Sequence, residues 1–192
     1  TLFPRYIRVN GRPLMLIYRA NRMPDPAATP ALWREESRRA GFPDLYICRV
    51  ESFADEHSPP ASVDCDAAVE FQPDWRVLGS LARDPAVIGH RVYDYASVAE
   101  KMMRRDPPPF KQLPCVVPMW DNSPRRETDA VIFSNSTPEV YGRWLAHSAR
   151  RALSLPAGER LVFINAWNEW GEGNHLEPDR RHGHGYLVAT QT

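Results

Sequence analysis

The chain has 192 residues, of which 43% are hydrophobic, a size and composition that suit one domain with an apolar core. Basic and acidic residues balance at 24 each, with no basic tail or stripe, which argues against a nucleic-acid partner. No apolar run approaches the roughly 18 residues that a membrane span requires, and no signal peptide is visible. We therefore expect a chain without a membrane span.

Three cysteines, Cys48, Cys65 and Cys115, are odd in number and widely spaced. They match neither a CxxC motif nor a disulfide framework. Two of them lie in strand-like runs, where a small buried hydrophobic side chain is expected. We predict reduced thiols and a cytoplasmic location.

The first third of the chain contains three apolar runs that predict strands, at 14–18, 45–50 and 66–71. A charged residue stands at or near the end of each run: Arg19, Glu51 and Glu70. Between the first two runs, the Thr29-Pro30 pair predicts the start of a helix over about 30–40, with Gly41 as its stop. Residues 52–63 read as a long loop, a type of segment that is often functional.

The remainder alternates helices and strands in the same way. We predict helices over 74–83 and 97–105, and a third from Pro138 to about Leu153 with Thr137 as its N-cap. The run 115–120 predicts a strand that is followed by Asp121 and Asn122. The apolar run 161–164 predicts the last strand.

This alternation indicates an α/β fold of βαβ units with a parallel sheet, on or around a (β/α)8 TIM-type barrel. We count five or six strands, and a complete barrel has about 250 residues, so residues 1–192 are expected to form a single, incomplete barrel domain. Right-handed crossovers would bring the strand ends to one face. The residues expected there are Arg19, Glu51, Glu70, Tyr93, Trp120, Asp121, Asn122, Glu169 and Glu172.

The stretch 161–179, LVFINAWNEWGEGNHLEPD, carries the strongest chemical signal. It packs two tryptophans, two amides and two carboxylates into a few positions, and two carboxylates with aromatic platforms suit chemistry at a sugar carbon. On an extended strand Glu169 and Glu172 would point to opposite faces. They converge only if the chain turns after Trp170, which Gly171 and Gly173 permit. The alternative is a surface turn with two solvated glutamates.

The motif FINAWNEWGEGNHLEPD (163–179), followed by GHGYLVA (183–189), resembles the WbsX-type glycosyltransferases, the glycoside hydrolase family 99-like proteins of bacterial polysaccharide gene clusters. The resemblance continues upstream in YIRVNGRPLMLIYR (6–19), DAAVEFQP (66–73), VVPMWDNSPRR (116–126) and NSTPEVYGRWL (135–145), and so covers essentially the whole chain. It implies a (β/α)8 barrel of which this sequence supplies about the C-terminal five units.

Family 99 endo-acting mannosidases carry a Glu-Trp-x-Glu motif, which this sequence matches from Glu169 to Glu172. The resemblance implies that Glu169 is the base that assists the substrate's own 2-hydroxyl and that Glu172 protonates the leaving oxygen. The x position is commonly histidine and is Gly171 here, which leaves the substrate and the reaction open. The residues expected to bind substrate are Tyr18, Arg19, Glu51, Glu70, Trp120, Asp121, Asn122, Arg125, Trp167, Asn168, Trp170 and Glu177.

Two further clusters have functional and structural interpretations. Arg125 and Arg126 would hold a nucleotide-sugar diphosphate if strand 115–120 is the seventh of a barrel, although arginine pairs recur along the chain and a solvated pair is the default. His175, His182 and His184 lie near acidic residues but lack the helical spacing of zinc enzymes. We expect a structural or sugar-contacting role for these histidines, no metal, and no cofactor.

The sequence therefore predicts an enzyme of glycosyl transfer in bacterial surface-polysaccharide assembly, either lipopolysaccharide O-antigen or capsule, acting on a glycan or nucleotide-sugar substrate. One alternative is a family 99-like glycoside hydrolase, similar to the endo-α-mannosidases, that uses the same carboxylates. Another is a carbohydrate-binding fragment without catalytic activity.

Overall fold

Strands that run parallel and are joined by helices dominate the structure, a computed structural model that describes residues 4–79, 81–83 and 89–191. The chain divides into two compact units, and each unit is assembled from three segments. Unit 1 consists of Thr1–Phe71, Pro107–Pro114 and Ala152–Leu161. Unit 2 consists of Gln72–Asp106, Cys115–Arg151 and Val162–Thr192. The single-domain expectation stays a prediction.

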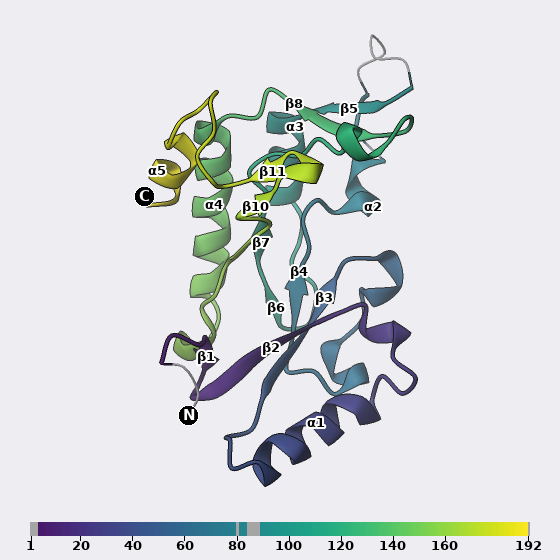
Figure 1. Cartoon of the computed structure of the whole chain (residues 1–192), viewed down its shortest axis with the longest axis vertical. Helices are drawn as coiled ribbons and strands as arrows, with labels where there is room; N and C mark the ends of the chain where they lie inside the picture. Colours follow the sequence, from purple (N-terminus) through teal and green to yellow (C-terminus); the bar gives the residue numbers. More distant parts are fainter. Residues whose placement is uncertain (1–3, 80, 84–88, 192) are drawn as a thin grey trace. The chain divides into compact units, whose positions relative to one another are not determined.

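A five-stranded sheet forms the centre of unit 1, in the order β1-β2-β3-β4-β6 (Figure 1). Its strands are β1 (Arg8–Val9), β2 (Arg12–Tyr18), β3 (Tyr46–Glu51), β4 (Ala67–Glu70) and β6 (Gln112–Leu113). The short β1 is antiparallel to β2, and the other neighbours are parallel. The three strands predicted in the first third of the chain are therefore confirmed.

Helix α1 (Ala28–Arg39) connects β2 to β3, and it ends where the sequence predicted but does not start there. Gly41 adopts a left-handed φ of +77°, and the Phe42 N–H reaches the Ser37 carbonyl at 3.0 Å, which closes the C-terminus. The expected Thr29 cap is wrong. The helix begins at Ala28, whose N–H donates to Asp25 Oδ1 at 2.9 Å.

The loop between β3 and β4 contains two short 3₁₀ helices, η2 (Ala54–Glu56) and η3 (Pro60–Val63). Together with η1 (Ala20–Arg22), they help to cover the apolar residues of the sheet. This small core consists of Ile17, Ala20, Ile47, Val63 and Cys65. All three cysteines are free and buried.

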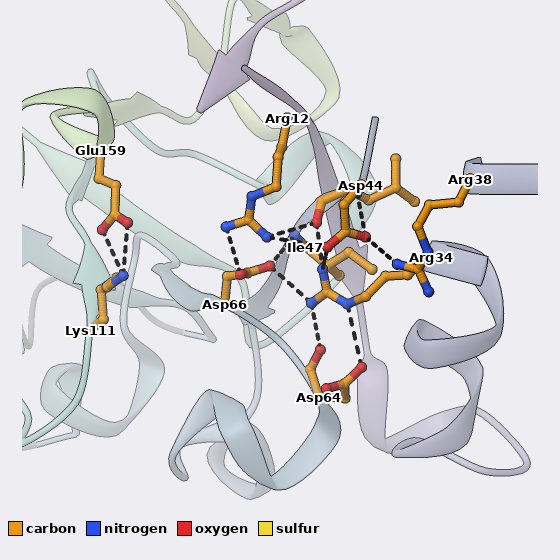
Figure 2. Close-up of polar contacts among 10 residues, drawn as sticks. Arg12, Arg34, Arg38, Asp44, Ile47, Asp64, Asp66, Lys111 and Glu159 are labelled. Carbon is orange, nitrogen blue, oxygen red and sulfur yellow. Dashed lines mark hydrogen bonds and ion pairs between the residues drawn. The ribbon is translucent and has the colours of Figure 1, made fainter. Parts of the chain in front are cut away.

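A network of charged side chains joins β2, α1 and the residues just before β4 in unit 1 (Figure 2). The Asp66 carboxylate accepts from Arg12 and Arg34 at 2.9 Å each, and from the Ile47 N–H at 2.9 Å. Burial raises the pKa of Asp66, but these hydrogen bonds and the positive charge of Arg34 outweigh burial and lower the pKa overall. In the same unit, Lys111 lies 2.7 Å from Glu159, so segment 107–114 is tied to segment 152–161.

The described residues of unit 2 form three two-stranded ladders. Its strands are β5 (Arg91–Asp94) beside β8 (Val131–Ser134), β7 (Cys115–Val116) beside β9 (Phe163–Ile164), and β10 (Asn168–Glu169) beside β11 (Asn174–His175). The first two pairs are parallel and the third is an antiparallel hairpin. The predicted strand 115–120 forms a ladder only at its start, because Pro118 has no N–H to donate to a neighbouring strand.

The helices of unit 2 are α2 (Trp75–Leu78), α3 (Tyr95–Met103), α4 (Pro138–Leu153) and α5 (Gly185–Thr190). The prediction of the 138–153 helix is confirmed, and Thr137 Oγ1 accepts from the Val140 N–H at 3.4 Å as its cap. The predicted helix 74–83 is much shorter, and Ser80 lies outside the described residues. Among the described helices, none is long and apolar enough to cross a membrane.

Aromatic side chains fill the core of unit 2. Tyr95 and Trp144 pack with ring centroids 6.2 Å apart, and Tyr141 contacts Tyr186 edge to face at 5.5 Å. The second contact joins α4 to α5, the two helices beside each other in Figure 1. The Tyr95 hydroxyl donates to the Val117 carbonyl at 2.6 Å, so this buried backbone carbonyl just beyond β7 has a side chain as its hydrogen-bond donor.

Candidate functional site

The glutamate-bearing segment forms a tight hairpin in unit 2. Asn168 pairs with His175 and Glu169 with Asn174, and the 3₁₀ turn η6 (Trp170–Glu172) connects the two strands. Gly173 ends this turn with a left-handed φ of +53°. The chain thus turns after Trp170, as convergence of the two carboxylates requires.

The carboxylates of Glu169 and Glu172 meet at one guanidinium. Arg125 ends the 3₁₀ turn η4 (Ser123–Arg125), and its Nη1 lies 3.0 Å from Glu172 Oε1 and 3.6 Å from Glu169 Oε1. The Glu169 side chain is 50% exposed and the Glu172 side chain 26% exposed. The two acids therefore share a cation but have different access to solvent.

These surroundings act on the pKa of Glu172 in opposite directions. Burial raises it most strongly and the negative charge of Glu169 raises it further, while Arg125 and Arg126 lower it. The net effect is a raised pKa. Because a carboxyl group with a raised pKa holds its proton closer to neutral pH, Glu172 is suited to donate a proton.

Gly171 gives the Arg125 side chain room to reach the two acids. A Cβ at position 171 would lie 3.2 Å from Arg125 Cδ and 3.5 Å from Glu169 Oε1. A larger residue at this position, such as the histidine common in the family 99 motif, would force Arg125 to move. The glycine and the arginine are therefore structurally linked in this sequence.

Arg125 was also predicted to hold a diphosphate. Its guanidinium already contacts two carboxylates, so the three side chains together carry a net negative charge when both acids are ionised. This arrangement does not favour an additional anion at Arg125. Its role in phosphate binding stays a prediction.

The aromatic side of the hairpin is organised around Trp170. Its indole Nε1 donates to Glu177 Oε2 at 2.8 Å, and its ring stacks on His175 at 3.7 Å between centroids. His175 Nε2 in turn lies 3.0 Å from Asp179 Oδ2. Trp167 and Asn168 are exposed, so their side chains are available to a ligand. Among the described residues no group of three or more His, Cys, Asp or Glu is placed to hold a metal ion.

The predicted residues Trp120, Asp121 and Asn122 lie beside the hairpin. Their contacts are mainly with neighbouring segments of the protein itself. The Asp121 N–H donates to the Glu172 carbonyl at 2.7 Å, and Asp121 Oδ1 accepts from the Ser123 N–H at 2.9 Å. Asn122 Oδ1 accepts from the Val131 N–H at 2.8 Å. Trp120 is buried against Trp75, with ring centroids 5.2 Å apart.

The other predicted residues belong to unit 1, at the ends of its parallel strands. Glu51 and Glu70 are buried, stand opposite each other on β3 and β4, and Glu51 Oε2 accepts from Gln112 Nε2 at 2.5 Å. Tyr18 is exposed at the end of β2. That these residues lie on one face with the glutamate pair stays a prediction.

Sequence reasoning missed some residues of these regions. Phe53 contacts Tyr18 edge to face at 6.2 Å, and the Arg19 guanidinium lies 4.3 Å from the Phe53 ring centre. His57 Nδ1 lies 3.5 Å from Glu51 Oε2. Both missed residues belong to the loop 52–63, whose length was the available signal.

Comparisons with known proteins agree with the resemblance in the sequence. The chain is 38% identical over 193 aligned residues to "Uncharacterized protein WxcX" in two strains of Xanthomonas campestris pv. campestris, across 98% of its own length and 28% of theirs. A solved structure described as a "Glycoside hydrolase-like protein" matches with a TM-score of 0.62 at 17% identity, over 97% of this chain and 55% of that chain. This likeness shows a shared mixed α/β fold. The family described as "Glycosyltransferase WbsX" matches residues 3–190, and the chain therefore belongs to the WbsX glycosyltransferase family.

Proposed function

We propose that this chain supplies the catalytic carboxylates of a carbohydrate-active enzyme that transfers glycosyl groups in bacterial surface-polysaccharide assembly. One observation carries the proposal: Glu169 and Glu172 converge on Arg125 at an exposed hairpin beside tryptophan rings. Membership of the WbsX family supports the reaction class.

The two acids have different roles in this proposal. Glu172 is the less exposed carboxyl and has a raised pKa, so it donates a proton to the leaving oxygen as the bond from that oxygen to the sugar carbon breaks. Glu169 is the more exposed and accepts the proton of the attacking hydroxyl, which the resemblance to family 99 assigns to the sugar's own 2-hydroxyl. This first step leaves the 2-oxygen bonded to the reacting sugar carbon. A hydroxyl of the acceptor glycan then bonds to that carbon as its bond to the 2-oxygen breaks, the acceptor's proton passes to the Glu172 carboxylate, and Glu169 returns its proton to the 2-oxygen.

We also propose that the chain forms the C-terminal part of a (β/α)8-type barrel. The parallel strands β2, β3, β4 and β6 of unit 1 and the two parallel pairs of unit 2 support this arrangement. The chain spans 28% of the length of its WxcX relatives, so the activity of the whole protein is part of the proposal. In a barrel, Tyr18, Arg19, Glu51 and Glu70 would line the same face as the glutamate pair.

Hydrolysis by the same pair is the second candidate. The Glu169 side chain is 50% exposed, so water can approach it, and the two reactions differ only in whether water or a sugar hydroxyl is the acceptor. Lipopolysaccharide or capsule as the destination of the product is inferred from the family resemblance.

The test measures turnover of nucleotide sugars and α-mannosides by the complete protein that its gene encodes. Glu169→Gln and Glu172→Gln are each expected to lower turnover by about a hundredfold or more, the scale of lost acid–base catalysis. Glu100→Gln is the matched control, because Glu100 is a surface glutamate that pairs only with Arg104 among the described residues. The consumed substrate distinguishes transfer from hydrolysis. Glycan binding without turnover, or full activity in both site variants, would overturn the proposal.

A further inference from the structure

A cavity of about 600 Å³ lies in unit 2 and is separate from the carboxyl groups of the glutamate pair. Its walls come from the residues after β7, the end of β8 and the segment after it, β11, the loop 179–182, and α5. Gly173 and Asp121 also line it, and both are adjacent to Glu172: Gly173 follows it in sequence, and the Asp121 N–H donates to its carbonyl at 2.7 Å. The cavity therefore shares a wall with the turn that carries Glu172.

Three buried polar atoms belong to side chains that line this cavity and have no hydrogen-bond partner among the described residues. They are Trp120 Nε1, His175 Nδ1 and Tyr186 Oη. Their residues are 2%, 7% and 3% exposed. An unsatisfied buried polar group is costly, and buried polar groups in native proteins almost always have partners, so a polar ligand is the natural complement.

The chemistry of these three atoms suits sugar hydroxyls. The indole N–H of Trp120 can only donate, and the Tyr186 hydroxyl can donate and accept. When His175 Nε2 donates to Asp179, the neutral ring leaves Nδ1 as an acceptor. A hydroxyl group both donates and accepts, so a polyhydroxylated ring satisfies such a mixed set.

The charged residues of the lining add a preference for a negative group. Arg180 and Arg181 line the cavity, and neither forms an ion pair with another described residue. The Asp179 carboxylate is already occupied by His175 and by the N–H groups of Arg181 and His182, at 2.6–3.0 Å. The lining therefore includes two exposed arginines without an ion-pair partner among the described residues, and guanidinium groups recognise carboxylates and phosphates well.

We propose that this cavity is a subsite for a sugar residue that carries a negative group, either the carboxylate of a uronic acid or a phosphate. The sugar ring contacts Trp120, His175 and Tyr186, and the negative group lies at Arg180 and Arg181. Because the cavity adjoins the Glu172 turn, the subsite holds the part of the glycan next to the reacting bond. This inference deepens the proposed function and rests on it.

Binding is measured by isothermal titration calorimetry on the complete protein, which requires no turnover. The probes are a glucuronic acid-containing disaccharide, mannose 6-phosphate, and a neutral mannobiose. We expect the two acidic probes to bind at least tenfold more tightly than mannobiose, and whichever is tighter identifies the carboxylate or the phosphate as the natural group. Equal binding of all three, or no binding, would overturn the proposal.

Two variants locate the binding. Arg181→Gln is expected to weaken the acidic probes about tenfold without affecting mannobiose, and Tyr186→Phe to weaken all three by several-fold. Arg150→Gln is the matched control, because Arg150 is an exposed arginine of α4 outside the cavity. Acidic probes that bind equally well to Arg181→Gln place their site elsewhere and overturn the proposal.

The glutamate variants separate this inference from the proposed function. If Glu172→Gln loses turnover while no acidic probe binds the wild type, the catalytic assignment stands and the subsite is wrong. If the acidic probes bind through Arg181 while Glu172→Gln keeps full turnover, the subsite stands and the catalytic assignment is wrong.

Discussion

Replacing Gly173 with alanine places a methyl group in a turn that has no room for it. The residue adopts a φ of +53°, and a Cβ there would lie 3.0 Å from Asp121 Cβ, 3.0 Å from Asp121 O and 3.1 Å from Asp121 N. Two of these three atoms are backbone, which cannot rotate away as a side-chain tip can. The turn that carries Glu172 must therefore shift relative to Asp121.

The chain offers a matched control in Gly183. It has nearly the same φ, +55°, but a Cβ there meets nothing within 4 Å. Left-handed backbone costs an alanine about 1–2 kcal/mol in both variants, and the reduced freedom of the unfolded chain is also shared. Crowding acts only at Gly173, where forced repacking adds about 1–3 kcal/mol.

Urea unfolding of both variants measures this difference in unfolding free energy. Gly173→Ala is expected to lose about 1–3 kcal/mol more than Gly183→Ala. Activity should fall with it, because the shift displaces Glu172. If Gly183→Ala is as destabilised as Gly173→Ala, the close approach to Asp121 does not constrain the hairpin and the reasoning is refuted.

Three further variants test charges and hydrogen bonds. Arg125→Ala removes a positive charge that lowers the pKa of Glu172, so this pKa should rise in the variant. The alkaline limb of the pH–rate profile should then move to higher pH, because the acid keeps its proton longer. A limb that does not move would show that Glu172 is not the acid. Asp66→Asn should cost about 1.5–3 kcal/mol of unfolding free energy at pH 7, the scale of hydrogen bonds to a charged group, because the Asp66 side chain is partly exposed. Because the pKa of Asp66 is lower in the folded state, its ionised form stabilises the fold above the unfolded pKa, and this stabilisation is lost as the pH falls through the folded pKa. The unfolding free energies of wild type and variant should therefore converge in urea titrations below about pH 4. A difference that stays constant with pH would contradict this. Tyr95→Phe should cost about 1–3 kcal/mol in the same assay, because the buried Val117 carbonyl loses its donor, and an unchanged midpoint would argue that the carbonyl finds another partner.

The sequence predicts the elements whose signals are local. The apolar runs at 14–18 and 45–50 became β2 and β3. A parallel strand buried on both faces reads as a continuous hydrophobic stretch, and β3 fits this rule, whereas Leu16 and Tyr18 of β2 are exposed. The stop at Gly41 was equally local. The start of α1 was not predicted, because Asp25 competes with Thr29 as its cap and only the path of the chain decides between them.

The candidate site also has parts that local sequence signals predict and parts that they do not. The glycines around Trp170 predict a turn and hence the approach of Glu169 to Glu172, since these residues are neighbours in sequence. The pairing of both acids with Arg125 depends on η4 meeting η6, which no local pattern encodes. Strand β8 was missed although the run Val131–Phe133, between Asp129 and Asn135, carried a usable signal.

The interleaving of the two units constrains how the protein is made. Unit 1 closes with Ala152–Leu161, and unit 2 takes its last segment after that point. During synthesis Lys111 is made 48 residues before Glu159, so unit 1 cannot close this ion pair until the later segment leaves the ribosome, although domains generally fold as they emerge. A gene shortened after Arg151 would remove a segment from both units, so neither half can be obtained by cutting the chain once.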